Sequence, residues 1–256
     1  MKKIDALLLV CAFALVLLLN SYFNFSSGIA INKDATLLEE KYYLAGPDPY
    51  YNMRLLEKTL ETGKYPYMGG KYGELDPLLN YPLHGSGSRP PLFTMLTIGV
   101  GKIFSLFINE TDAMGYAMQW IPAIYGALLV IPVYFLGKIV FNRKVGIIAA
   151  LFIALIPIHL ASGHGSAYSL YDHDSFILLL TTSSIVFLIM AIKEENRKKS
   201  ILLASLSGLC VAGITMTWVS GEYIYALIAV YGIVQMIIDI LTKKIETRIP
   251  TAILTS

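Results

Sequence analysis

Charged side chains are scarce in this sequence of 256 residues, because Asp, Glu, Lys and Arg together make up only 15% of it. A typical soluble domain carries about 25%. The two cysteines, Cys11 and Cys210, both lie inside apolar runs, where they are read as packing residues that say little about redox compartment. The formal net charge of +2 is too small to indicate a nucleic-acid partner.

Long apolar runs are abundant in the sequence. Several reach about 20 residues, which is enough to cross roughly 30 Å of hydrocarbon. The first run follows Lys2 and Lys3, exceeds the core of a signal peptide and lacks a small-residue cleavage site, so we interpret it as an uncleaved helix. The sequence predicts an all-α polytopic membrane protein with six spans, at 5–26, 117–141, 145–162, 175–192, 200–219 and 222–242.

Basic residues in short loops favour the cytoplasmic side of a membrane. They gather at 2–3, 142–144, 193–199 and 243–244. Placing all four inside requires that the apolar run 91–108 does not cross the membrane. Lys102 in its middle would be costly at the bilayer centre. We therefore predict an interfacial or re-entrant helix there, and one large external loop over 27–110.

That loop contains a candidate amphipathic helix in "DPYYNMRLLEKTLETG". Asp48 is expected as its N-cap, with Pro49 in the first helical position. Gly63 is expected to end it. Three apolar residues fall on one face at helical spacing: Met53, Leu56 and Leu60.

Three acids fall on the same external surface in this topology. Asp48 precedes the loop helix, while Asp172 and Asp174 precede the run 175–192. Each is also a reasonable helix-capping residue. In an extended Asp-His-Asp segment, however, both carboxylates would point the same way and His173 would point away. Mg²⁺ and Mn²⁺ prefer such oxygen ligands, so the pattern predicts a divalent-metal site.

Other polar residues near these acids are weaker candidates. Arg54 could pair with Asp48 or with a phosphate, but a solvated charge on a helix is the commoner case. His84 and His164 are candidate substrate contacts, although surface histidines are the commoner case. Arg89 adds positive charge beside His84 in "YPLHGSGSRPP".

Several stretches, in the same order, resemble the N-terminal membrane portion of the archaeal-type oligosaccharyltransferase catalytic subunit, a class C type transmembrane glycosyltransferase. They are "GPDPYYNMRLLEKTLETG", "ELDPLLNYPLHGSGSRPPL", "GALLVIPVYFLGKIVFNRKVGIIAALFIALIPIHL", "DHD" and "TWVSGEYIY". The resemblance implies transfer of an oligosaccharide from a dolichyl phosphate or diphosphate carrier to the asparagine of Asn-x-Ser/Thr sequons.

The resemblance also implies roles for residues. Asp48 would bind Mn²⁺ or Mg²⁺ and the acceptor amide, and Asp172 and Asp174 would be metal ligands, with Asp174 also catalytic beside Asp48. A carboxamide nitrogen is a poor nucleophile, so contacts to carboxylates would polarise it, and the metal would offset charge on the leaving phosphate.

The sequence departs from the family pattern in two ways. Family members carry an arginine about two turns before the second acidic motif, but 145–171 has neither Arg nor Lys; His164 is a weak substitute. Family members also continue into a soluble sequon-reading domain with a Trp-Trp-Asp motif, which this chain lacks. Residues 1–256 are therefore expected to be a truncated portion, with a separate C-terminal half as a candidate partner.

The expected partners are a lipid-linked oligosaccharide, a sequon-bearing protein and membrane lipid. The expected location is the plasma membrane, with the site on its external face. Two alternatives remain open at this point. One is another membrane glycosyltransferase that uses a polyprenyl-phosphate sugar, and the other is a non-catalytic fragment that retains metal and lipid-glycan binding. A transporter is the least favoured, because the acids lie at the surface rather than at the midplane.

Overall fold

The structure is a computed structural model that describes residues 3–26, 38–66, 89–156 and 165–242. All regular structure in these ranges is helical. The elements are α1 (Lys3–Ser26), α2 (Leu38–Lys41), α3 (Pro47–Thr62), α4 (Leu92–Phe104), α5 (Glu110–Leu128), α6 (Val130–Val140), α7 (Arg143–Phe152), η1 (Ile153–Leu155), α9 (Asp174–Lys193), α10 (Arg197–Thr215), η2 (Val219–Glu222) and α11 (Tyr223–Thr242).

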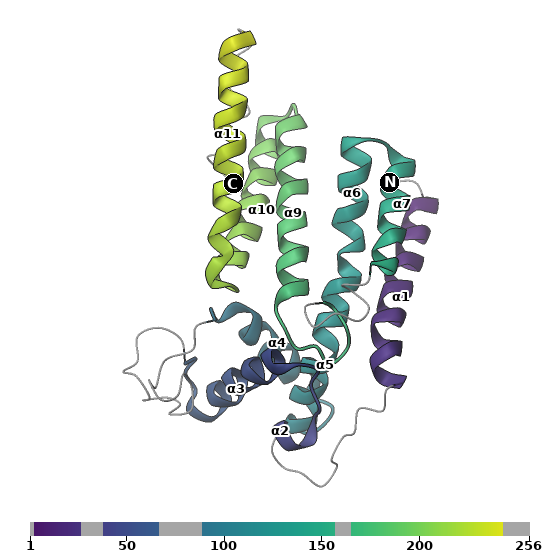
Figure 1. Ribbon diagram of the computed structural model, residues 1–256, viewed down its shortest axis with the longest axis vertical. Coiled ribbons are helices and arrows are strands. Elements are labelled where there is room, and N and C mark those ends of the chain that lie inside the picture. The colour runs from purple at the N-terminus through teal and green to yellow at the C-terminus, as the bar shows by residue number, and fades with distance from the viewer. Residues whose placement is uncertain (1–2, 27–37, 67–88, 157–164, 243–256) are drawn as a thin grey trace.

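The long helices run roughly parallel to one another, and the short helices α2, α3 and α4 gather below one end of them (Figure 1). Within the described ranges, five helical stretches are long and apolar enough to cross a membrane: Lys3–Ser21, Glu110–Val140, Asp174–Lys193, Arg197–Thr215 and Val219–Thr242. Long apolar helices therefore occur at five of the six predicted spans. The predicted span 145–162 is helical only as far as Leu155, and its remainder begins with extended Ile156 and continues outside the described residues.

The predicted span 117–141 begins earlier than expected, at Glu110, and consists of α5 and α6. Leu129 separates the two helices without leaving the helical region, with φ −57° and ψ −26°. Pro132 follows at the position whose N–H would bond the carbonyl of Leu128 in a continuous helix. Because proline has no N–H, that bond cannot form and the helix is interrupted there.

Helix α4 is the element predicted not to cross the membrane. Its 13 residues span only about 20 Å, which is shorter than a bilayer core. It begins against the end of α10, where the Leu92 N–H donates to the Met216 carbonyl at 2.9 Å. In Figure 1 it lies beneath the ends of the long helices rather than among them.

Basic residues collect at the opposite end of the bundle, which we term the basic end. Its described members are Lys3, Lys138, Arg143, Lys144, Lys193, Arg197, Lys198 and Lys199, at the ends of their helices. One buried acid lies among them: Asp5 is 2% exposed. The Arg143 Nε donates to Asp5 at 2.6 Å and the Tyr134 hydroxyl donates to it at 3.0 Å. This ion pair joins α1 to α6 and α7 and satisfies the buried carboxylate.

The position of α4 makes a topological prediction. In a chain with Cys11 and Cys210 replaced by alanine, a membrane-impermeant thiol reagent should label Lys64→Cys, before α4, and Glu110→Cys, after it, from the same side of the membrane. The reason is that a helix that does not cross the membrane leaves the residues before and after it on one face. Labelling of these two cysteines from opposite sides would show that α4 crosses the membrane.

Candidate functional site

Helix α3 presents Asp48 in its first turn. The expectation that Asp48 caps this helix is wrong, because the N-cap is Gly46 and the helix starts two residues earlier than expected, at Pro47. Gly46 has φ +93°, a backbone conformation that is readily available only to glycine. The side chain of Asp48 is 44% exposed and pairs with Arg89.

The remainder of α3 follows the prediction. Met53 and Leu56 are buried and Leu60 packs against the same cluster, which also contains Phe93 from α4 and Met114 from α5. Gly63 ends the helix in a left-handed conformation with φ +68°. This apolar face fixes α3 against α4 and α5, so the position of Asp48 is set by core packing.

The second acidic segment departs from the expected geometry. His173 has φ −81° and ψ −9°, which is helical rather than extended, and Asp174 is the first residue of α9. As a result His173 does not point away from the acids. Its Nδ1 lies 2.6 Å from Asp172 Oδ1 and its Nε2 lies 4.0 Å from Asp174 Oδ1. The helical turn brings all three side chains together, so the imidazole joins the site.

The segment leading to Asp172 is anchored by backbone hydrogen bonds to α1, to α5 and to the segment just before α3. The Tyr168 N–H donates to the Asn20 carbonyl of α1, and the Ser169 N–H donates to the Gln119 carbonyl of α5, both at 3.0 Å. The Ser169 carbonyl accepts from the Ala45 N–H, also at 3.0 Å. Ser169 adopts φ +68°, uncommon for a residue other than glycine. The two acidic segments are thus linked through the backbone just before each acid.

Arg89 joins the two acidic segments through its side chain. Its Nη2 lies 3.0 Å from Asp48 Oδ1 and its Nη1 lies 2.9 Å from Asp172 Oδ1. Nη1 also donates to Asn52 Oδ1 at 2.8 Å. The guanidinium lies over the ring of Tyr51, 5.3 Å from its centroid. A planar guanidinium can hold two carboxylates at once in this way, whereas a lysine ammonium offers only a point charge.

Asn52 provides a second link, one turn after Asp48 on α3. Its Nδ2 donates to the Tyr171 carbonyl at 2.9 Å and to Asp172 Oδ1 at 3.2 Å. Tyr171 itself is fully buried and stacks on Phe93 with ring centroids 5.1 Å apart. The polar contacts of the site therefore rest directly on an aromatic core.

Asp172 is 1% exposed and would be costly to ionise without partners. Burial acts to raise the pKa of its carboxyl. The hydrogen bond and charge of His173, together with the charge of Arg89, outweigh that effect and hold the pKa below its ordinary value of 3.8. Asp172 is therefore a carboxylate at neutral pH.

The donor set fits a divalent cation. Among the described residues, Asp172, His173 and Asp174 form a group whose ligand atoms lie within 4.8 Å of one another. Two carboxylates favour Mg²⁺ or Mn²⁺, and an imidazole extends the choice toward Zn²⁺. Asp48 is connected to this group through Arg89. The structure therefore contains a candidate acidic metal site, which we term the acidic site: Asp48, Asp172, His173 and Asp174 with Arg89 and Asn52.

Of the three weaker candidates, the structure describes only Arg54, which is half-buried on α3. His84 and His164 lie outside the described residues.

Three residues of the acidic site were not predicted in their observed roles. Asn52 had no predicted role, Arg89 was predicted only as a nearby positive charge, and His173 was predicted to point away from the acids. Helical spacing could have placed Asn52 beside Asp48, since residues i and i+4 share a face. No local signal links Arg89 to Asp172, 83 residues away.

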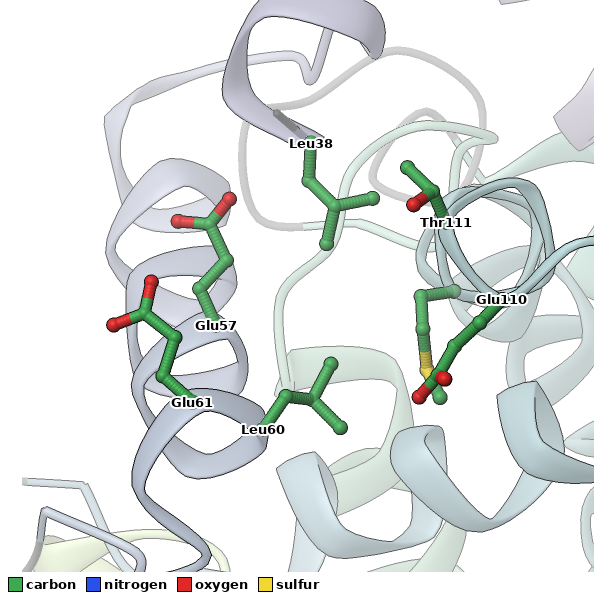
Figure 2. A pocket seen from close by; sticks show the side chains of 7 residues that line it. Leu38, Glu57, Leu60, Glu61, Glu110 and Thr111 are labelled. Carbon is green, nitrogen blue, oxygen red and sulfur yellow. The ribbon is translucent and has the colours of Figure 1, made fainter. Parts of the chain in front are cut away.

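A hollow of about 330 Å³ lies beside α3, and none of the residues of the acidic site lines it. Glu57 and Glu61 line one wall from α3, and Glu110 and Thr111 line the other from α5, with apolar Leu38 and Leu60 between them (Figure 2). Lys58 pairs with Glu61 at 2.6 Å and Lys102 with Glu110 at 2.5 Å. These lysines offset the acidic charge, so the hollow is not a second cation site of comparable character.

The acidic site and helix order can be compared with known proteins. The family model described as "Oligosaccharyl transferase STT3, N-terminal" matches residues 7–256. The chain belongs to the STT3 family. This result confirms the resemblance drawn from the sequence motifs and makes the chain a membrane protein related to glycosyltransferases.

Curated relatives and solved structures agree with the STT3 assignment. The chain is 27% identical over 211 residues to dolichyl-phosphooligosaccharide-protein glycotransferase 1 of Pyrococcus furiosus, covering 80% of this chain and 20% of that protein. The Archaeoglobus fulgidus oligosaccharyltransferase in complex with Zn and sulfate matches with a TM-score of 0.67 and 23% identity, over 88% of this chain and 26% of that one.

A further structure of the Archaeoglobus protein, tethered by a disulfide to an acceptor peptide containing the NVT sequon, gives a TM-score of 0.69 at 23% identity, over 91% of this chain and 26% of that one. At this level of identity the structural likeness shows the fold. The present STT3-family chain spans about a fifth to a quarter of the length of these proteins.

Arg89 makes a prediction about stability. Arg89→Gln should lower the free energy of unfolding by about 2–4 kcal/mol, because it leaves the buried carboxylate of Asp172 without its guanidinium partner. Thermal unfolding in detergent would measure the change. Lys64→Gln, which removes one exposed positive charge after α3, is the matched control. Adding Asp172→Asn to Arg89→Gln should restore part of the loss; equal melting temperatures for the two single variants would contradict the bridging role.

Proposed function

We propose that this chain is the donor- and metal-binding membrane portion of an oligosaccharyltransferase. It would act in the transfer of an oligosaccharide from a dolichyl phosphate or diphosphate carrier to the asparagine of Asn-x-Ser/Thr. The single observation that carries the proposal is the meeting of Asp48 with Asp172 at one end of the bundle, through Arg89 and Asn52, in a chain of the STT3 family. Membership alone would not require these distant acids to meet.

We propose Mn²⁺ or Mg²⁺ as the cofactor, held by Asp48, Asp172 and Asp174. The close grouping of two carboxylates with His173 supports this choice, and the Zn in the related Archaeoglobus structure is consistent with a divalent ion. Such an ion, when bound, supplies Lewis-acid stabilisation of the charge that develops on a leaving phosphate.

The chain's own residues would bind and orient the acceptor. Asp48 and Asp174 are the more exposed acids, with side-chain exposures of 44% and 34%, so they are the ones able to accept hydrogen bonds from a carboxamide nitrogen. Asp172 is buried, and its Oδ1 accepts hydrogen bonds from Asn52, Arg89 and His173, so it fixes the geometry of the site in addition to serving as a proposed metal ligand. Arg54, His84 and His164 remain proposed contacts to the donor.

The site is proposed to face the exterior of the plasma membrane. The charge pattern supports this orientation, because basic residues concentrate at the end of the bundle opposite to the acidic site (Figure 1). Residues 27–110 would form the first external loop. The partners would be the lipid-linked oligosaccharide, a translocated sequon-bearing protein and a C-terminal portion of the kind that the longer relatives contain.

A transfer assay tests this function. The membrane-embedded chain, a native extract of lipid-linked glycan, Mn²⁺ and a fluorescent Asn-x-Thr peptide should yield a glycopeptide, seen as a mass shift. Asp48→Ala should reduce its yield at least 100-fold, because the site would lose an acceptor contact. Glu61→Gln removes an exposed carboxylate of the same helix and should leave the yield unchanged. A Gln-x-Thr peptide is the matched substrate control.

Direct Mn²⁺ binding separates the alternatives. One outcome is that the unmodified chain binds Mn²⁺, that Asp172→Asn binds it more weakly, and that no glycopeptide forms. This outcome would overturn the proposal that the chain transfers glycan and would favour a non-catalytic portion. Sugar transfer to a lipid or glycan acceptor rather than to the sequon peptide would favour another polyprenyl-phosphate-dependent glycosyltransferase. Absence of both Mn²⁺ binding and transfer would overturn the metal site as well.

A further inference from the structure

Two adjoining hollows lie between α6 and α9, away from the acidic site. The first, of about 200 Å³, is almost wholly apolar and is lined from both helices by residues such as Ile131, Phe135 and Val186, with Ser183 contributing a hydroxyl. The second, of about 300 Å³, shares Phe135 and Met190 with the first. Together they form one groove, which we term the α6–α9 groove, along the face where these two helices run side by side (Figure 1).

The groove changes character along its length. The second hollow is lined by Lys138 from α6 and by Lys193 and Glu194 at the end of α9. Ile131 and Lys138 are seven residues apart on α6, about 10 Å along the axis, and Ser183 and Lys193 are ten apart on α9, about 15 Å. A single leaflet of hydrocarbon is about 15 Å thick. The groove is therefore apolar over one leaflet and positively charged at the level of that leaflet's headgroups.

The two lysines have no carboxylate partner within the described part of the chain. Lys193 Nζ donates to the Ile139 carbonyl at 2.9 Å, which uses one of its three donors. Lys138 Nζ lies 5.6 Å from the ring centroid of Tyr134 and 5.9 Å from that of Phe135. Glu194, the acid in the lining, accepts from the Asn196 N–H at 3.0 Å and offsets one of the two positive charges. With two lysines and one carboxylate, the lining of the second hollow keeps a formal net charge of +1.

We propose that the α6–α9 groove binds an anionic phospholipid of the surrounding bilayer. One acyl chain would lie along Ile131, Phe135 and Val186, and the phosphate would sit between Lys138 and Lys193. Clustered basic side chains between membrane helices attract anionic headgroups, and each lysine near such a surface strengthens binding about fivefold. An anionic lipid matches both the apolar part and the basic part of the groove. Its acyl chain is joined to a phosphate, and the phosphate would reach the level of the two lysines when the chain lies in the apolar part.

Native mass spectrometry of the chain from micelles with equal phosphatidylglycerol and phosphatidylcholine tests the proposal. The unmodified chain should retain one phosphatidylglycerol in preference to phosphatidylcholine. The double variant Lys138→Gln/Lys193→Gln should bind this lipid with an affinity that is roughly 10- to 30-fold lower. The matched control is Lys198→Gln/Lys199→Gln, which removes the same charge from exposed lysines at the basic end that do not line the groove.

The control decides between a site and a diffuse attraction. Equal loss in both double variants, or no loss in Lys138→Gln/Lys193→Gln, would overturn the proposal. Preferential retention of added polyprenyl phosphate over phosphatidylglycerol would mean that the occupant is a carrier lipid instead. The readout is lipid binding, so it is independent of whether the acidic site transfers glycan.

A photoreactive probe identifies the occupant in membranes. With Cys11 and Cys210 replaced, Ser183→Cys labelled with a benzophenone maleimide places the probe in the apolar part of the groove. A lipid adduct is the expected product on irradiation, and its yield should rise with the phosphatidylglycerol content of the membrane. An adduct to a polypeptide would show that protein covers the groove and would overturn the lipid assignment.

Discussion

The acidic end of the molecule depends on the contact of one guanidinium with two carboxylates. Arg89 enters from the segment before α4, Asp48 from α3 and Asp172 from the turn before α9, so three separate segments are joined by one side chain. Without it, a nearly fully buried carboxylate would face Asp48 with no positive charge between them. The apolar cluster around Phe93 brings these segments together, and Arg89 makes their acids compatible with one another.

The same pairing of a buried acid with an arginine recurs at the basic end. Asp5 is 2% exposed and is held by Arg143 and Tyr134, which ties the first helix to the turn between α6 and α7. In a bilayer such a carboxylate could not remain ionised without a partner. At each end of the bundle, a buried carboxylate therefore requires the helix arrangement that brings its arginine within reach. The apolar faces between the two ends are less selective, because they can pack in several helix arrangements.

Local signals predicted the elements well and the site only in outline. Hydrophobic length predicted five spans, and Gly63 marked the end of α3, because both depend on neighbouring residues. The cap of α3 was misplaced by two residues, since the left-handed conformation of Gly46 was not readable from Asp48 and Pro49 alone. The geometry around His173 was also mispredicted, because α9 begins immediately after it and draws it into a helical turn. The role of Arg89 depends on a contact across 83 residues, and the sequence carries no period or motif that encodes that distance.

The long separation of the site's parts has a consequence for biogenesis. Asn52 and Asp172 are 120 residues apart, so a ribosome has already released the whole of α3, α5 and α6 before the second acidic segment exists. Because the segment 165–173 is anchored on α1, α3 and α5 at once, it can dock only on helices that are already inserted and packed. A nascent chain that stalls before α9 thus has its first apolar helices in the bilayer and no complete acidic site. Completion of the acidic site therefore requires that α1, α3 and α5 have already taken up their native arrangement.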